Sequence, residues 1–164
     1  MHYVIGVGSN LGQASASVRQ AMRDVENRVV AADVRRSSLY RTSPVGGPDQ
    51  PDFVNAVLVL ESEMTPDAVL EVLQGIEQQA GRVRDVRWGP RTLDLDIVAA
   101  GDIVSEKPEL TLPHPRAHER AFVLIPWHEI EPEASLPRIG PIAAVIDGGF
   151  DDQAIEVLSE DEWA

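Results

Sequence analysis

Residues 93–99, LDLDIVA, place two aspartates in a segment that otherwise has the composition of a β-strand. Apolar residues alternate with Asp94 and Asp96, so a strand here would have one apolar face and one acidic face. Aspartate is depleted from strands because its side chain favours caps and turns. Two carboxylates on one face, with Cα atoms roughly 6.5–7 Å apart, repel each other unless a cation or hydrogen-bond donors lie between them. The segment is therefore either a half-exposed strand with an acidic outer face or a clamp for a metal ion.

The composition is that of a soluble globular protein, because 43% of the 164 residues are hydrophobic and 25% are charged. The formal charge of −13 argues against a nucleic-acid partner, since a phosphate backbone requires a basic surface. No segment approaches the roughly 20 apolar residues of a membrane helix, and the N-terminus lacks the features of a signal peptide. Cysteine is absent, which excludes disulfides and thiolate metal ligands. We therefore expect a single domain, residues 1–164, in the cytoplasm and with no membrane partner.

The charges are distributed unevenly along the chain. Residues 147–164 hold seven acidic residues and no basic one, and we expect this acidic C-terminal tail to be solvated or loosely docked. Thirteen of the 14 basic residues are arginines, and four of these lie within residues 82–91. A planar guanidinium suits phosphate and carboxylate groups. The arginine cluster therefore indicates either an anionic ligand or an ordinary surface of salt bridges.

Hydrophobic periodicity predicts an α+β protein. The expected strands are 2–7, 33–40, 53–61 and 93–99, and the expected helices are 15–31 and 66–81, the second with Thr65 as its N-cap and Gly81 as its stop. Two loops, 43–52 and 82–92, are longer than usual connections, and later helices are expected within 113–130 and over 141–147. The order β-α-β-β-α-β is that of a ferredoxin-like fold with an antiparallel sheet. Two helices would cover one face, and the other face would be a binding platform or be covered by the C-terminal third.

Three shorter patterns have two interpretations each. The GVGSN segment at 6–10 follows a strand, as a phosphate-binding turn would, but it lacks the Gly-x-Gly-x-x-Gly spacing, which favours a structural turn. His114 and His118 have the spacing of two zinc ligands, yet no third ligand follows, which favours a polar contact near a site for His114 and a surface position for His118. Phe53 and Asn55 would share a strand face, where they either recognise a flat heterocycle or pack in the core.

The acidic strand and the arginine cluster together indicate phosphate chemistry. Asp94 and Asp96 offer hard oxygen ligands, for which Mg²⁺ is the natural cation in a chain without cysteine. Magnesium usually brings phosphate oxygens with it, and Arg82, Arg84 and Arg91 would complement them. Carboxylates, a metal and arginines are the recurrent components of phosphoryl transfer. The spacing does not choose between one metal ion and two.

The motifs together resemble a known enzyme family, the 6-hydroxymethyl-7,8-dihydropterin pyrophosphokinases of folate biosynthesis. The matching segments are GSNLG (8–12), YRTSP (40–44), QPDFVNA (50–56), IEQQAGRVR (76–84), RWGPRTLDLDI (87–97), LTLPHP (110–115) and ERAFVLIP (119–126). They follow the family's order through most of the first 130 residues. The resemblance implies a ferredoxin-like core with additional C-terminal helices. It also implies transfer of pyrophosphate from ATP to the pterin hydroxymethyl group, with release of AMP.

The resemblance also implies a role for each matching residue. Asp94 and Asp96 would hold two Mg²⁺ ions, and Arg82 and Arg91 would stabilise charge on the transferring group. The expected ATP contacts are Gln74, Glu77, Arg84, Ile97, Thr111, His114 and Arg120. Those to the pterin are Thr42, Val45, Phe53, Asn55, Trp88 and Phe122, with the two phenylalanines on either side of the ring. Both long loops match segments that fold over the substrates, and we expect the protein to be a monomer.

Some positions depart from the family pattern, and two other functions stay open. Ser43, Glu109, Pro115 and a shortened 82–92 loop differ from that pattern, and these differences concern ATP affinity and loop closure rather than the reaction. A metal-dependent phosphodiesterase would use the same aspartates without any pterin. A non-catalytic binding module would use the ferredoxin-like sheet alone, since that fold hosts many functions.

Overall fold

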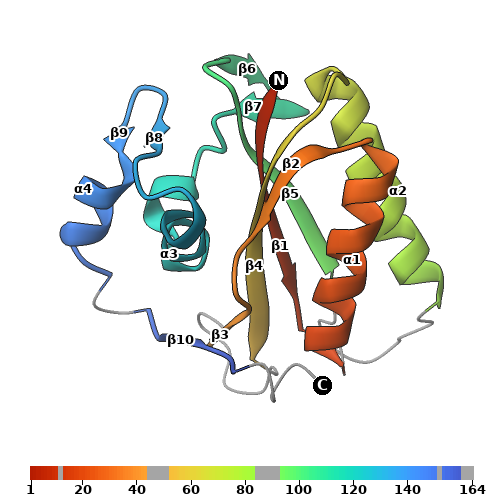
Figure 1. The fold of residues 1–164 in the computed structure, drawn as a ribbon, viewed down its shortest axis with the longest axis horizontal. Helices are drawn as coiled ribbons and strands as arrows, with labels where there is room; N and C mark the ends of the chain where they lie inside the picture. Colours follow the sequence, from red (N-terminus) through yellow and green to blue (C-terminus); the bar gives the residue numbers. More distant parts are fainter. Residues whose placement is uncertain (11–12, 44–51, 84–92, 151–152, 160–164) are drawn as a thin grey trace.

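The computed structural model describes residues 1–10, 13–43, 52–83, 93–150 and 153–159 (Figure 1). Its strands are β1 (His2–Ser9), β2 (Ala32–Arg36), β3 (Tyr40–Thr42), β4 (Phe53–Glu61), β5 (Leu93–Ala100), β6 (Ser105–Lys107), β7 (Leu110–Leu112), β8 (Ser135–Leu136), β9 (Gly140–Pro141) and β10 (Ile155–Val157). Its helices are α1 (Ala14–Arg28), α2 (Pro66–Val83), the 3₁₀ turn η1 (Ala117–Glu119), α3 (Ala121–Ile130) and α4 (Ile142–Asp147).

The framework is an antiparallel sheet of six strands, counted over the described residues, in the order β10-β3-β4-β1-β5 with β2 also paired to β4. β1 lies between β4 and β5 and is antiparallel to both. The order β-α-β-β-α-β along the chain, with a mainly antiparallel central sheet, confirms the predicted ferredoxin-like α+β fold.

Both faces of the sheet are covered by helices (Figure 1). α1 and α2 pack on one face, where alternate strand residues such as Ile5, Leu58 and Leu95 join their apolar stripes in one core. α3 packs on the opposite face, over residues such as Val4 and Val57, and α4 packs against α3. The central strands are therefore buried on both sides, and the C-terminal third supplies the second cover. Because side chains alternate along β5, Asp94 and Asp96 lie on the face that carries α3.

Several predicted boundaries move in the structure. Thr65 Oγ1 accepts a hydrogen bond from the N–H of Ala68 (3.3 Å), which confirms the N-cap of α2. The prediction that Gly81 stops this helix is wrong, since α2 continues to Val83. A glycine inside a helix costs only about 1 kcal/mol, which the packed stripe of α2 outweighs. α1 ends at Arg28 rather than at residue 31, because Val30 adopts a left-handed φ of 52°.

The predicted strand 33–40 is two strands in the structure. β2 and β3 both pair with β4 and are separated by residues 37–39. Ser37 lies in the break, where its Oγ accepts from the N–H of Val57 (2.8 Å) and its own N–H donates to the Val57 carbonyl (3.0 Å). A side chain thus takes the place of a ladder partner at this point, and the strand divides there.

The expectation of a loosely docked C-terminal tail is wrong for its described part. β10 pairs with β3 as the edge strand of the sheet, and Glu156 forms an ion pair with Arg41 (2.8 Å). Leu158 is 3% exposed, and its N–H donates to the carbonyl of Leu39 (2.8 Å). Acidic composition predicted solvation, but the buried Leu158 joins the core on the α1 and α2 face and anchors the segment. No described helix is long and apolar enough to cross a membrane.

The packing of α3 yields the first testable prediction. Trp127 is 2% exposed in the core on the α3 face, and its Nε1 donates to Glu131 Oε1 (2.8 Å). We expect Trp127→Ala to lower the free energy of unfolding by about 3–5 kcal/mol in urea titrations, because it leaves a large cavity under α3. Val104→Ala, at a side chain that is 39% exposed, serves as the control and should change it by less than about 0.5 kcal/mol. A loss below about 1 kcal/mol for Trp127→Ala would contradict the α3 packing.

Candidate active site

A row of paired residues crosses β3, β4, β1 and β5, at the polar part of the sheet face that carries α3. Asn55 on β4 pairs with Gly8 on β1, and Gly8 in turn pairs with Asp94 on β5. On the other edge of β4, Tyr40 of β3 pairs with Asn55. Gly6 is likewise the partner of Asp96. Because paired residues of antiparallel strands point to the same side, two aspartates stand beside two positions without side chains.

Gly8 cannot carry a side chain in this row. A Cβ built on Gly8 would lie 2.5 Å from Oδ1 of Asn55, whereas one on Gly6 would meet its nearest neighbour, Val98, at 3.6 Å. The Asn55 amide is held in place because its Nδ2 donates to Oγ1 of Thr42 (2.8 Å). The GVGSN segment was predicted as a turn, but Gly6 and Gly8 lie inside β1. Their function there is to leave the sheet surface open.

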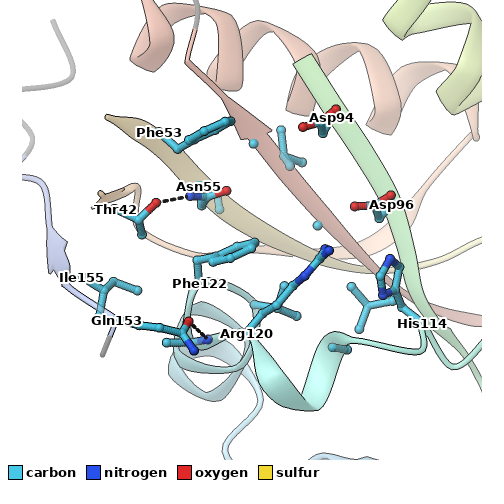
Figure 2. A pocket seen from close by; sticks show the side chains of 18 of the residues that line it. Thr42, Phe53, Asn55, Asp94, Asp96, His114, Arg120, Phe122, Gln153 and Ile155 are labelled. Carbon is cyan, nitrogen blue, oxygen red and sulfur yellow. Dashed lines mark hydrogen bonds between the residues drawn. The ribbon is translucent and has the colours of Figure 1, made fainter. Parts of the chain in front are cut away.

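A cavity of about 450 Å³ lies over this open surface (Figure 2). Its floor is formed by β1, β4 and β5, and its wall by the start of α3 and by the segment leading into β10. Phe53 from β4 and Phe122 from α3 lie on either side of Asn55 in this view, at the end of the cavity away from the aspartates (Figure 2). The cavity thus has an aromatic and amide end and an acidic end.

Asp94 and Asp96 form the acidic end, and their chemistry fits Mg²⁺. Within the described residues no group of three or more His, Cys, Asp or Glu side chains forms a metal cage. Two carboxylates are nevertheless a usual protein contribution to a magnesium site, because this ion keeps water and phosphate oxygens as its other ligands. The bare backbone at Gly6 and Gly8 leaves space beside the carboxylates for such ligands.

Glu77 of α2 supports the acidic strand from the opposite face of the sheet. Its Oε2 accepts a hydrogen bond from the N–H of Leu95 (2.8 Å), the residue between the two aspartates. Burial raises the pKa of the Glu77 carboxyl, the charges of Asp94 and Asp96 raise it further, and the hydrogen bond from Leu95 opposes them. Glu77 therefore fixes the backbone of β5 at the point where both aspartates project.

Arg120 and His114 bring donor groups toward the aspartates. In Figure 2 the Arg120 side chain extends from the start of α3 into the space between Phe122 and Asp96, and its guanidinium carbon lies 5.5 Å from the Phe122 ring centroid. The N–H of His114 donates to the carbonyl of Val98 (2.9 Å), which fixes it beside β5. Burial lowers the pKa of His114, Asp96 acts in the opposite direction, and the nearby arginines lower it further. A neutral imidazole at pH 7 follows.

The structure brings together many of the residues predicted from sequence. Those that line the cavity are Thr42, Phe53, Asn55, Asp94, Asp96, His114, Arg120 and Phe122. Four other predicted residues do not line the cavity. Gln74 is exposed on α2, and Glu77 binds the β5 backbone. Ile97 is buried under α1 and α2, and Thr111 Oγ1 donates to the carbonyl of Lys107 (3.0 Å). Val45, Arg84, Trp88, Arg91 and the side chain of Arg82 lie outside the described part of the structure, so their roles stay predictions.

Sequence reasoning missed two groups of cavity residues. Gly6 and Gly8 carry a signal that could have found them, because glycine is unfavourable in a strand unless close approach requires it. Gln153 and Ile155 of the C-terminal segment also line the cavity. Nothing in their local sequence marks them, since they reach the site through the pairing of β10 with β3.

Fold and site together define an α+β protein whose ferredoxin-like sheet carries an acidic ligand pocket with aromatic walls. Residues 4–132 match the family described as 7,8-dihydro-6-hydroxymethylpterin-pyrophosphokinase (HPPK). The chain therefore belongs to the HPPK family.

Individual relatives agree with this assignment. The 2-amino-4-hydroxy-6-hydroxymethyldihydropteridine pyrophosphokinase of Pseudomonas aeruginosa is 42% identical over 133 residues, which cover 81% of this chain and 82% of the relative. The Haemophilus influenzae protein of the same name is 39% identical over 153 residues, covering 93% and 96%. A crystal structure of Plasmodium falciparum HPPK-DHPS superposes with a TM-score of 0.69 at 13% identity. This chain spans only 45% of that longer protein, and the similarity there concerns the fold.

The close approach of Gly8 to Asn55 yields the second prediction. Gly8→Ala must displace the Asn55 amide, so we expect binding at the aromatic end of the cavity to weaken by about tenfold or more, measured by calorimetric titration with 6-hydroxymethylpterin. Gly75→Ala is the matched control, because a Cβ there meets nothing within 4 Å. It should leave binding unchanged and stabilise α2 by up to about 1 kcal/mol. Equal binding by Gly8→Ala and the unsubstituted protein would show that Asn55 does not hydrogen-bond to the ligand.

Proposed function

We propose that this chain transfers pyrophosphate from MgATP to the hydroxymethyl group of 6-hydroxymethyl-7,8-dihydropterin and releases AMP, a step of folate biosynthesis. The observation that carries the proposal is the division of one cavity into an aromatic, amide-lined end and an acidic end. A flat heterocycle suits the first, and metal-bound phosphates suit the second. The relatives' names describe the same pyrophosphokinase activity.

The pterin would bind at the aromatic end. Phe53 and Phe122 offer two ring faces between which a planar bicycle can stack. Because Nδ2 of Asn55 is engaged by Thr42, its Oδ1 is directed over Gly8 as an acceptor for N–H groups of the heterocycle. Val45 and Trp88, which lie outside the described residues, would complete this end of the site, as the family resemblance implies.

The triphosphate would bind at the acidic end. Asp94 and Asp96 would hold Mg²⁺, two ions by analogy with the family. When bound, the metal supplies neutralisation of phosphate charge and makes the pterin hydroxyl more acidic. Arg82 and Arg91 would stabilise charge on the transferring group, and Arg84 and Arg120 would bind ATP. Such a site works by positioning and charge compensation, and it requires no covalent intermediate on the protein.

In the proposed reaction, the hydroxymethyl oxygen attacks the β-phosphorus of ATP. A bond forms between these two atoms, the bond from the β-phosphorus to the bridging oxygen of the α-phosphate breaks, and AMP leaves with that oxygen. The hydroxyl proton passes to one of the aspartates or to water. Stacking between Phe53 and Phe122 would hold the pterin so that its hydroxymethyl group points toward Asp94 and Asp96.

The remaining assignments belong to the same proposal. His114, with Gln74, Glu77, Ile97 and Thr111, would bind the nucleotide, as the family resemblance implies, and of these His114 lines the cavity. For Glu77 the structure adds a positioning role, because its carboxylate already holds the N–H of Leu95. The whole chain would act as one domain, as a monomer and in the cytoplasm.

Substrate omission tests the proposal directly. We expect AMP to form from MgATP only when 6-hydroxymethyl-7,8-dihydropterin is present, measured by chromatography of the nucleotides. AMP formed without the pterin would favour a metal-dependent phosphodiesterase, and ADP would indicate single-phosphate transfer. Pterin bound without any nucleotide product would favour a binding module. Each of these three results would contradict the proposed function.

The acidic end yields a separate prediction. We expect Asp96→Ala to lower Mg²⁺-dependent turnover by at least about a hundredfold, because one of two carboxylates that hold the metal is lost. The fold should survive, since Asp96 is only partly buried and its neighbours Leu95 and Ile97 supply the core contacts. Circular dichroism and urea titration measure the fold in parallel. Unfolding of this variant at room temperature would argue that Asp96 is structural.

A further inference from the structure

The C-terminal segment is fixed beside the cavity. β10 continues the sheet next to β3, where Ile155 pairs with Thr42, itself a cavity residue. Glu156 is the next residue, and it forms its ion pair with Arg41. Ile155 and Gln153 both line the cavity. A segment from the end of the chain therefore contributes part of the wall next to α3.

Gln153 binds the backbone at the start of α3 with both atoms of its amide. Its Oε1 accepts from the N–H of Ala121 (2.9 Å), and its Nε2 donates to the carbonyl of Glu119 (2.8 Å). Ala121 is the first residue of α3, and the preceding Arg120 makes no side-chain cap. The first N–H groups of a helix have no partner within the helix, so an external acceptor is needed there. Gln153 supplies it from a distant part of the sequence (Figure 2).

The two contacts bracket Arg120. The hydrogen bonds to Glu119 and Ala121 restrain the backbone on both sides of Arg120, at the junction between η1 and α3. Arg120 projects into the cavity from this junction, and Phe122 follows one residue later, with the guanidinium 5.5 Å from its ring. A change at Gln153 therefore acts on both side chains through the backbone.

We propose that Gln153 is a positioning residue for the reaction: it caps α3 from the C-terminal segment and so sets Arg120 and Phe122 in the cavity. The effect of Gln153 on turnover rests on the proposed function, whereas its capping of α3 does not. The role requires an acceptor and a donor on one planar group, which an amide provides. Methionine has a similar length and provides neither at useful strength, and glutamate provides the acceptor alone.

Three variants separate positioning from general stability. Gln153→Met removes both hydrogen bonds, Gln153→Glu keeps an acceptor for Ala121, and Glu156→Gln is the control that disturbs the same segment away from the cavity. The first measurement is amide hydrogen exchange by NMR at Ala121, with Ile5 in β1 as the internal reference. The second is steady-state kinetics with separate KM values for the pterin and MgATP.

We expect Gln153→Met to raise the exchange rate of Ala121 by about tenfold or more relative to Ile5. The KM values for the pterin, through Phe122, and for MgATP, through Arg120, should each rise by about tenfold, with kcat reduced less. Gln153→Glu should preserve the protection of Ala121. Glu156→Gln should change KM by no more than about twofold, because an exposed ion pair contributes little.

Two results would overturn the proposal. One is a Gln153→Met protein with Ala121 exchange unchanged. The other is a lower melting temperature with both KM values unchanged, which would make Gln153 structural only. If the unsubstituted protein forms no AMP with the pterin, the proposed function fails, but exchange at Ala121 still decides whether the cap exists.

Discussion

The register of β1 between β4 and β5 determines how the polar groups of the central strands are placed relative to one another. Side chains alternate with a period of two, so a slip of β5 by one residue against β1 would turn Asp94 and Asp96 toward α1 and α2. In the observed register Gly8 joins Asn55 on one side to Asp94 on the other. Asn55, which suits a heterocycle, and Asp94, which suits a metal, are far apart in sequence. The register places them on the two strands that flank Gly8, with only backbone between them.

This register is held from both faces of the sheet. On the α1 and α2 face, Ile5, Leu58 and Leu95 are buried together, which makes a slip costly. Glu77 adds a directional contact by accepting from the N–H of Leu95. On the other face, α3 packs over Val4 and Val57 and leaves Gly6 and Gly8 open to the cavity. The same sheet face is therefore a core at one end and a binding surface at the other.

Features that depend on local sequence patterns could be predicted, whereas features that depend on pairing between distant segments could not. The alternation of 93–99 identified the acidic face, and the apolar stripe of the second helix was readable because a helix has a fixed period. Gly8 was misread as a turn residue, because only the position of Asn55, on a different strand, explains it. Gln153 could not be identified from its neighbours, since it binds the backbone of Glu119 and Ala121, and every residue except proline offers the same N–H and carbonyl groups.

The acidic tail illustrates how composition and structure can point in different directions. An overall charge of −13 opposes the approach of an anionic nucleotide, and seven of the acidic residues lie within 147–164. Yet the described tail residues that line the cavity, Gln153, Ala154 and Ile155, are all neutral. The strand alternation of β10 directs Glu156 to Arg41 instead. In its described residues, the tail therefore contributes neutral side chains to the cavity wall, which composition alone would not have suggested.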